Sequence, residues 1–109
     1  MKELGFIRVG AIVNKLALAN PLKNADVIIK EIKKAETLGV SIVTTPELSL
    51  SGYTCGDLFL QEQLLDDSIK ALEQVLNETK DIDIISILGM PLRHDNQLFN
   101  CAAVITKGK

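Results

Sequence analysis

Short apolar runs in this chain alternate with longer segments in which apolar residues recur every three or four positions. The first run, residues 6–13, is rich in β-branched residues and precedes a turn signal at Asn20-Pro21, so it predicts a buried strand. Helical periodicity follows, and Gly39 stands where a left-handed C-terminal cap belongs. Residues 40–45 then return to strand composition. The apolar positions of the predicted helix are Ala25, Ile28, Ile29, Ile32, Ala35 and Leu38.

A loop, a second helix and two more strands are predicted after this unit. Residues 46–57 are rich in turn residues and lie between a strand and a helix, which is typical of loops that carry function. Residues 82–88 predict a third strand, which Gly89-Met90-Pro91 could close. A turn centred on Asp95-Asn96 leads into an antiparallel fourth strand over residues 98–106. The apolar positions of the second helix are Leu64, Leu65, Ile69, Leu72, Val75 and Leu76.

The predicted order β-α-β-α-β-β gives an α/β fold with a mixed sheet covered by helices. Parallel crossovers need helices, whereas the final hairpin does not. The sequence has no internal repeat, low-complexity tract or linker, so residues 1–109 are assigned to a single domain. Thr106–Lys109 reads as a strand entering a glycine turn whose partner strand is missing, and Met1 suggests a native start. We therefore expect the chain to be the N-terminal part of a larger domain.

Composition narrows the possible functions. The chain has 109 residues, 47% of them apolar, with a net charge of −2. Without a basic excess or tryptophan, it lacks the features of a nucleic-acid groove. No run reaches the roughly 18 apolar residues of a membrane span, and the first run is too short for a signal peptide. The two cysteines lie far apart without zinc-ligand spacing, so we expect no metal site, no disulfide and a cytoplasmic protein.

Glu47 is the best-placed carboxylate for chemistry. It follows the proline that ends the second strand, and ligands of open α/β sheets gather at the carboxyl ends of strands. We expect Leu48 and Leu50 to pack inward and hold Glu47 beside an apolar wall. Such a wall would raise the pKa of the carboxyl group and make it a usable base near neutral pH. The alternative is an ordinary surface glutamate in a loop.

Other polar candidates have simpler explanations. Cys55 is expected to be structural, because the nearby Asp57 disfavours a thiolate, and Asp57 itself suits a helix N-cap. Cys101 lies mid-strand, where buried inert thiols are common. His94 falls in a predicted turn and is expected to be solvated. No G-x-G-x-x-G follows the first strand, so dinucleotide binding by this segment is unsupported.

These segments together resemble the opening of the nitrilase, or carbon–nitrogen hydrolase, superfamily. The residues that carry the resemblance are Phe6–Val13, the helix through Gly39, and the run Thr45-Pro46-Glu47-Leu48-Ser49-Leu50-Ser51-Gly52-Tyr53. Residues 46–61 are similar to the N-terminal glutaminase domain of glutamine-dependent NAD synthetases. Gly89–Leu92 and Leu98–Ile105 match the later strand pair of the family.

The resemblance implies an αββα sandwich, of which this chain would supply the N-terminal part, and a Glu-Lys-Cys triad. That triad hydrolyses glutamine to supply ammonia for the amidation of deamido-NAD. Glu47 matches the general base, and Tyr53 is a candidate for the substrate pocket. The lysine and the nucleophilic cysteine of the family lie beyond Lys109, so we expect these residues alone to be inactive. The complete synthetase would use ATP and magnesium, with no cofactor bound by this segment.

A sandwich half would leave one sheet face uncovered, so we expect the chain to form a homo-oligomer through that face. Two alternatives to the glutaminase remain. One is a superfamily amidase acting on another substrate, such as an aliphatic amide, a nitrile or an N-carbamoyl amino acid. The other is a non-catalytic α/β interaction module, in which Glu47 is only a loop residue and the sheet face binds a partner.

Overall fold

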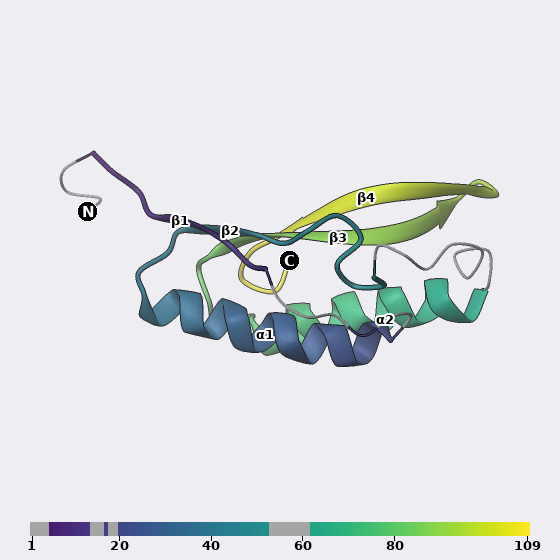
Figure 1. The fold of residues 1–109 in the computed structure, drawn as a ribbon, viewed down its shortest axis with the longest axis horizontal. Helices are drawn as coiled ribbons and strands as arrows, with labels where there is room; N and C mark the ends of the chain where they lie inside the picture. The colour runs from purple at the N-terminus through teal and green to yellow at the C-terminus, as the bar shows by residue number, and fades with distance from the viewer. Residues whose placement is uncertain (1–4, 14–16, 18–19, 53–61) are drawn as a thin grey trace.

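Two layers make up the computed structural model, which describes residues 5–13, 17, 20–52 and 62–109 (Figure 1). The sheet contains β1 (Val9–Ala11), β2 (Ile42–Thr44), β3 (Ile85–His94) and β4 (Gln97–Ile105), and the other layer contains α1 (Pro21–Thr37) and α2 (Glu62–Glu78). The strand order is β1-β2-β3-β4, with the first three strands parallel and β4 antiparallel to β3. This confirms the predicted α/β fold with a mixed sheet.

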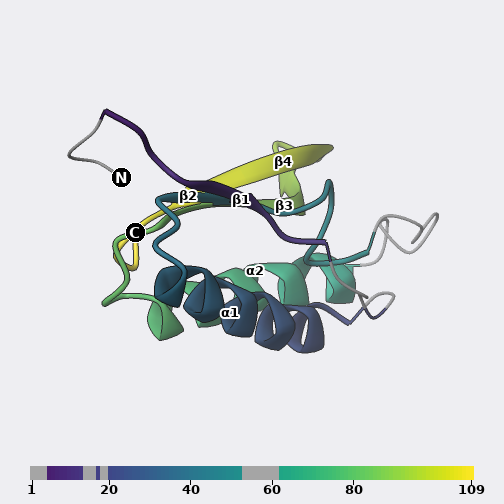
Figure 2. The same cartoon turned by 60° about the vertical axis from the view of Figure 1, so that its left-hand side comes forward.

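Both helices lie on the same face of the sheet, and the turned view shows them side by side (Figure 2). One helical layer on one sheet is half of the αββα arrangement that the resemblance implies. Within the described part of the chain, no helix is both long and apolar enough to cross a membrane.

Local signals in the sequence define both ends of α1. The side-chain oxygen of Asn20 accepts a hydrogen bond from the N–H of Lys23 at 3.3 Å, and Pro21 takes the first helical position, where no N–H is needed. Gly39 follows the helix with a φ of +74°, as its predicted role as a cap requires. Leu38, predicted on the apolar face, lies outside the helix at its C-cap and is exposed.

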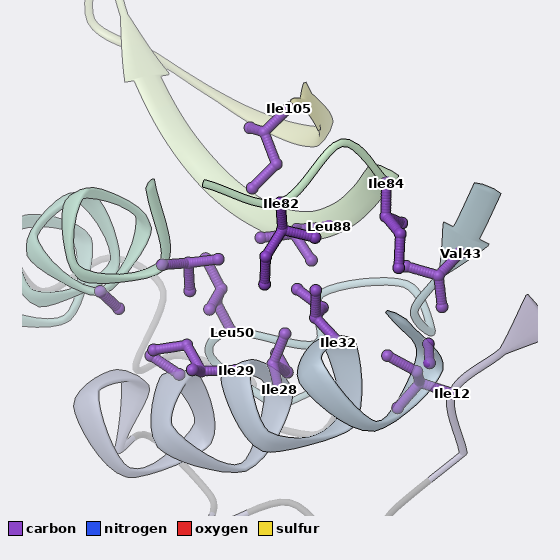
Figure 3. Close-up of a cluster of buried hydrophobic side chains, with 14 of the residues drawn as sticks. Ile12, Ile28, Ile29, Ile32, Val43, Leu50, Ile82, Ile84, Leu88 and Ile105 are labelled. Carbon is purple, nitrogen blue, oxygen red and sulfur yellow. The ribbon is translucent and has the colours of Figure 1, made fainter. Parts of the chain in front are cut away.

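The hydrophobic core fills the space between the helices and the sheet (Figure 3). Ile28 and Ile32 of α1 are fully buried in the same cluster as Leu88 of β3. Ile69 of α2, predicted on the buried face, is exposed because it lies beside the buried stripe and not on it. The stripe of α2 consists of Leu64, Leu65, Ser68, Ala71 and Val75.

The first strand is shorter and more exposed than the sequence predicts. Residues 6–13 were expected to form a buried strand, but only Val9–Ala11 form β1, and Val9 is 64% exposed. The reason is its position, since β1 is an edge strand of a sheet with one covered face. Ile12 is buried because it joins the core on the helical side.

Strand β3 continues past the residues expected to close it. Because β2 ends at Thr44, the last part of β3 pairs only with β4. The N–H of Gly89 points away from β4 toward the loop after β2. The backbone nitrogen of Pro91, two residues later, faces the same edge of β3 as that of Gly89. Its missing N–H therefore removes no hydrogen bond to β4. A proline that would interrupt a central strand is tolerated here for that reason.

A two-residue turn joins β3 to β4, as predicted. Asp95 and Asn96 have φ values of +50° and +62°, the pair of positive angles that a type I′ turn requires. His94 is exposed as expected, with Nε2 at 3.4 Å from Oδ2 of Asp95, but it is the last residue of β3 and not part of the turn in which it was predicted. The hairpin register is therefore fixed, with His94 opposite Gln97.

The other face of the sheet has no covering layer among the described residues. Cys101, Ala103 and Ile105 of β4 contact the core, so the alternate residues of that strand project to the opposite side. On that side Val104 is 65% exposed, and Val9 and Ile85 are also exposed. Below, this surface is called the open face.

We expect the chain to self-associate through the open face, because a contiguous apolar surface is unfavourable in water. Val104→Lys should lower the weight-average mass measured by sedimentation, since a buried ammonium would oppose pairing of two such faces. Ile69→Lys is the matched control, because Ile69 is an exposed apolar residue on the helical layer. A monomeric wild-type chain that binds no hydrophobic dye would contradict the expectation.

Candidate active site

The loop after β2 crosses the open face at Gly89. A Cβ atom on Gly89 would lie 2.4 Å from the backbone nitrogen of Leu48 and 2.7 Å from the carbonyl oxygen of Pro46, which is closer than real atoms allow. Only glycine therefore leaves room for the loop. Leu48 has a φ of +52°, a left-handed conformation that turns the chain at this crossing.

Hydrogen bonds fasten the loop to β3. The N–H of Thr45 donates to the carbonyl of Ile87 at 2.9 Å, and the N–H of Leu50 donates to the carbonyl of Gly89 at 3.0 Å. The hydroxyls of Thr45 and Ser49 lie 2.6 Å apart, and the N–H of Gly89 lies 3.3 Å from each. The loop thus continues on β3 the hydrogen bonding that β2 began, and residues 46–48 are held in a fixed arch.

Asn24 of α1 fastens the same loop from the side of the core. Its amide nitrogen donates to the carbonyls of Ala17 at 2.8 Å and Leu50 at 3.0 Å, and its oxygen accepts from the N–H of Ala17 at 2.6 Å. The side chain is fully buried, so these bonds satisfy groups that water cannot reach. One asparagine therefore joins α1, the segment before it and the loop.

Glu47 extends from the arch toward β4. Its Oε1 accepts a hydrogen bond from Nδ2 of Asn100, which lies 53 residues later in the chain. Leu48 and Leu50 are buried as predicted, but Glu47 is exposed, because the apolar wall lies beneath the loop and not around the carboxylate. The expectation that Leu48 and Leu50 hold Glu47 beside a sheltering apolar wall was therefore wrong.

The thiol of Cys101 and the ammonium group of Lys107 both lie away from this carboxylate. Cys101 follows Asn100 but packs against the core, so its half-buried thiol is on the opposite side of the sheet from Glu47. Lys107 is exposed, 3.8 Å from Asp83, and lies past the end of β4, about 20 Å from Asn100 at the spacing of a strand. Neither side chain belongs to the same site.

Three sequence candidates fall outside the described residues, namely Tyr53, Cys55 and Asp57. Their predicted roles remain predictions. In the part of the chain that is described, no group of three or more His, Cys, Asp or Glu side chains could hold a metal ion.

A cavity of about 570 Å³ lies at the opposite end of the sheet. Its lining includes Arg8, Ser41 and Asp83, which lie near the N-terminal ends of the parallel strands. Glu47 follows the C-terminal end of β2 and does not line this cavity. The candidate site is therefore a point on the open face and not the large cavity.

Three residues that shape the site were missed by the sequence analysis: Asn24, Gly89 and Asn100. The sequence contains a feature that could have identified two of them. A glycine inside a strand often marks a close backbone approach, and Gly89 does so here. Asn100 is the one polar amide in the apolar run from Leu98 to Ile105. No feature of the sequence identifies Asn24, because a polar residue near a helix start is usually solvated.

Nearly the whole chain is similar to one family of known proteins. Residues 9–109 match the family described as carbon-nitrogen hydrolase. The glutamine-dependent NAD(+) synthetase of Mycobacterium tuberculosis is 35% identical over 104 residues, which cover 95% of this chain and 15% of that protein. The chain therefore spans about 15% of the length of such curated relatives.

Solved structures show the same fold. The glutamine-dependent NAD(+) synthetase from Cytophaga hutchinsonii matches with a TM-score of 0.85 and 28% identity, over 94% of this chain and 17% of that one. An amidase from Nesterenkonia sp. matches with a TM-score of 0.79 at 20% identity, over 94% of this chain and 40% of its own. At that identity the amidase shows a likeness of fold alone.

Gly89→Ala should displace the arch, because the new methyl group would overlap the backbone at Pro46 and Leu48. We expect the free energy of unfolding, measured with urea, to fall by about 1–3 kcal/mol. Gly10→Ala is the matched control, since its Cβ would make ordinary contacts of 3.5 Å or more with Val40 and Val43. Equal effects of the two substitutions would contradict the close approach.

Asn24→Ala should lower the free energy of unfolding by about 1–3 kcal/mol, because it leaves buried backbone groups of Ala17 and Leu50 without partners. Asn77→Ala, an exposed change on α2, should stay within about 0.5 kcal/mol of wild type. Urea denaturation of both variants measures the difference. An Asn24→Ala variant with the free energy of unfolding of the wild type would show that the hydrogen bonds of Asn24 contribute nothing to stability.

Proposed function

Because this chain belongs to the carbon–nitrogen hydrolase family, we propose that it supplies the general base of a glutamine amidohydrolase. The domain would be the one that releases ammonia within a glutamine-dependent NAD synthetase. The observation that supports this most is the 35% identity to such a synthetase over 95% of the chain. The remaining parts of the domain, including the lysine and the cysteine of the triad, would come from polypeptide outside residues 1–109.

Glu47 is the proposed base. It would accept the proton of the cysteine thiol as the sulfur attacks the amide carbon of glutamine. The lysine would stabilise the negative oxygen of the tetrahedral intermediate. The proton would pass from Glu47 to the departing nitrogen, which leaves as ammonia, and water would then cleave the thioester to give glutamate.

The position of Glu47 on the open face supports this role. In this chain the carboxylate is exposed, because the described residues provide no layer over that face beyond the loop that carries Glu47. A second layer placed on the open face would exclude water from the carboxylate and bring a thiol to it. Shelter would then come from the covering layer, while the arch over Gly89 and the hydrogen bond from Asn100 would set the direction of the side chain.

ATP and magnesium would serve the NAD-forming reaction of the whole enzyme. We assign neither of them to residues of this chain. Glutamine would be the substrate bound at this face, with Tyr53 as a candidate contact in the pocket.

The apolar open face also favours a second candidate, a non-catalytic interaction module in which that face binds another protein. The coding sequence downstream of the Lys109 codon discriminates the two. An in-frame lysine in a turn and a later cysteine at a helix start would support the amidase. A stop codon at that position would favour the module.

A chimera tests the role of Glu47 directly. Residues 1–109 replace the matching segment of the Mycobacterium tuberculosis synthetase, and NAD formation is measured with glutamine and, separately, with ammonia. Glu47→Gln should lower the glutamine-dependent rate by about 10²- to 10⁴-fold, because the amide cannot accept the thiol proton. The ammonia-dependent rate should not change.

Glu73→Gln, an exposed change on α2, is the control and should leave both rates at the level of the unmodified chimera. Full glutamine-dependent activity of Glu47→Gln would show that Glu47 is not the base.

A further inference from the structure

We propose that Asn100 is a positioning residue for Glu47, which holds the carboxylate in the direction needed to accept the thiol proton. The inference rests on the proposed role of Glu47 as the base. It adds a residue from strand β4, near the far end of the chain.

The register of the hairpin places Asn100 beside the arch. Asn100 lies opposite Pro91 on β3, and Ala102 lies opposite Gly89. Both pairs project to the open face, since the intervening Cys101 packs against the core. The glycine that admits the backbone of Glu47 and the asparagine that binds its side chain are thus neighbours on one surface.

The chemistry of the contact fixes which atom donates. An ionised carboxylate can only accept hydrogen bonds, so the amide nitrogen of Asn100 is the donor and Oε1 of Glu47 the acceptor. A glutamate side chain has three rotatable bonds, and an arch that holds only its backbone leaves all three free. The bond from Asn100 therefore selects one orientation and leaves Oε2 as the proton acceptor.

A neutral donor suits this task better than a charged one. An arginine or lysine at position 100 would form an ion pair that strongly favours the ionised carboxylate and makes it a poor base. An amide is uncharged, so it orients the carboxylate without forming such an ion pair. The two paired strands hold the amide in turn, because Asn100 lies within the β3–β4 ladder and not in a loop.

The kinetic test uses the chimera described above. Asn100→Leu removes the donor at similar volume, and Asn100→Asp keeps the shape but cannot donate when ionised. Both should lower kcat for glutamine by about 10- to 100-fold with little change in KM, because misorientation affects the reaction more than substrate binding. Asn100→Gln keeps an amide and should recover part of the loss. The ammonia-dependent rate and the Asn77→Ala control should remain unchanged.

A spectroscopic test on the 109-residue chain does not depend on activity. The side-chain amide resonances of Asn100 should move in Glu47→Gln, because the charged acceptor is lost. Those of Asn24 should stay, because its acceptors are backbone carbonyls. Unchanged Asn100 resonances would overturn the proposed contact.

The outcomes separate this inference from the proposed function. If Glu47→Gln is inactive while Asn100→Leu keeps the wild-type kcat, Glu47 remains the base and the positioning role is wrong. If Glu47→Gln keeps full glutamine-dependent activity, both are wrong. A loss of kcat in Asn100→Leu that Asn100→Gln partly restores supports both.

Discussion

The contact between residues 46–48 and Gly89 is the constraint on which the arrangement of the site depends. At this point the backbone of a loop lies where a side chain of β3 would otherwise be. The approach is possible because β2 is short and leaves one edge of β3 available for hydrogen bonds from Thr45 and Leu50. The position of Glu47 follows from that crossing and not from the local preference of a loop.

Two amide side chains, the buried Asn24 and the exposed Asn100, extend this constraint to the rest of the chain. Asn24 links the loop to α1, and Asn100 links Glu47 to β4. Segments far apart in sequence therefore meet at one loop, and each makes a specific polar bond that an apolar contact could not replace. The carboxylate is fixed at its backbone by β3 and at its side chain by β4.

The two faces of the sheet have different roles. The helical side holds the core, including Leu88 and the half-buried thiol of Cys101. The open face carries Glu47, Asn100 and exposed apolar side chains such as Val104. The residues of the core and those of the proposed chemistry therefore lie on opposite faces of the same sheet, at alternate positions of its strands. The environment of Glu47 depends on what covers the open face.

The sequence by itself determined the order of elements, the helix cap at Gly39 and the turn at Asp95-Asn96, because these depend on periodicity or on backbone preferences of single residues. It also supplied Glu47 as the proposed base, through a motif. It did not determine the exposure of β1, the continuation of β3 through Pro91 or the partners of Glu47. These depend on which strand lies at an edge and on which backbone passes over Gly89. Such relations join residues distant in sequence, so only the tertiary structure decided them.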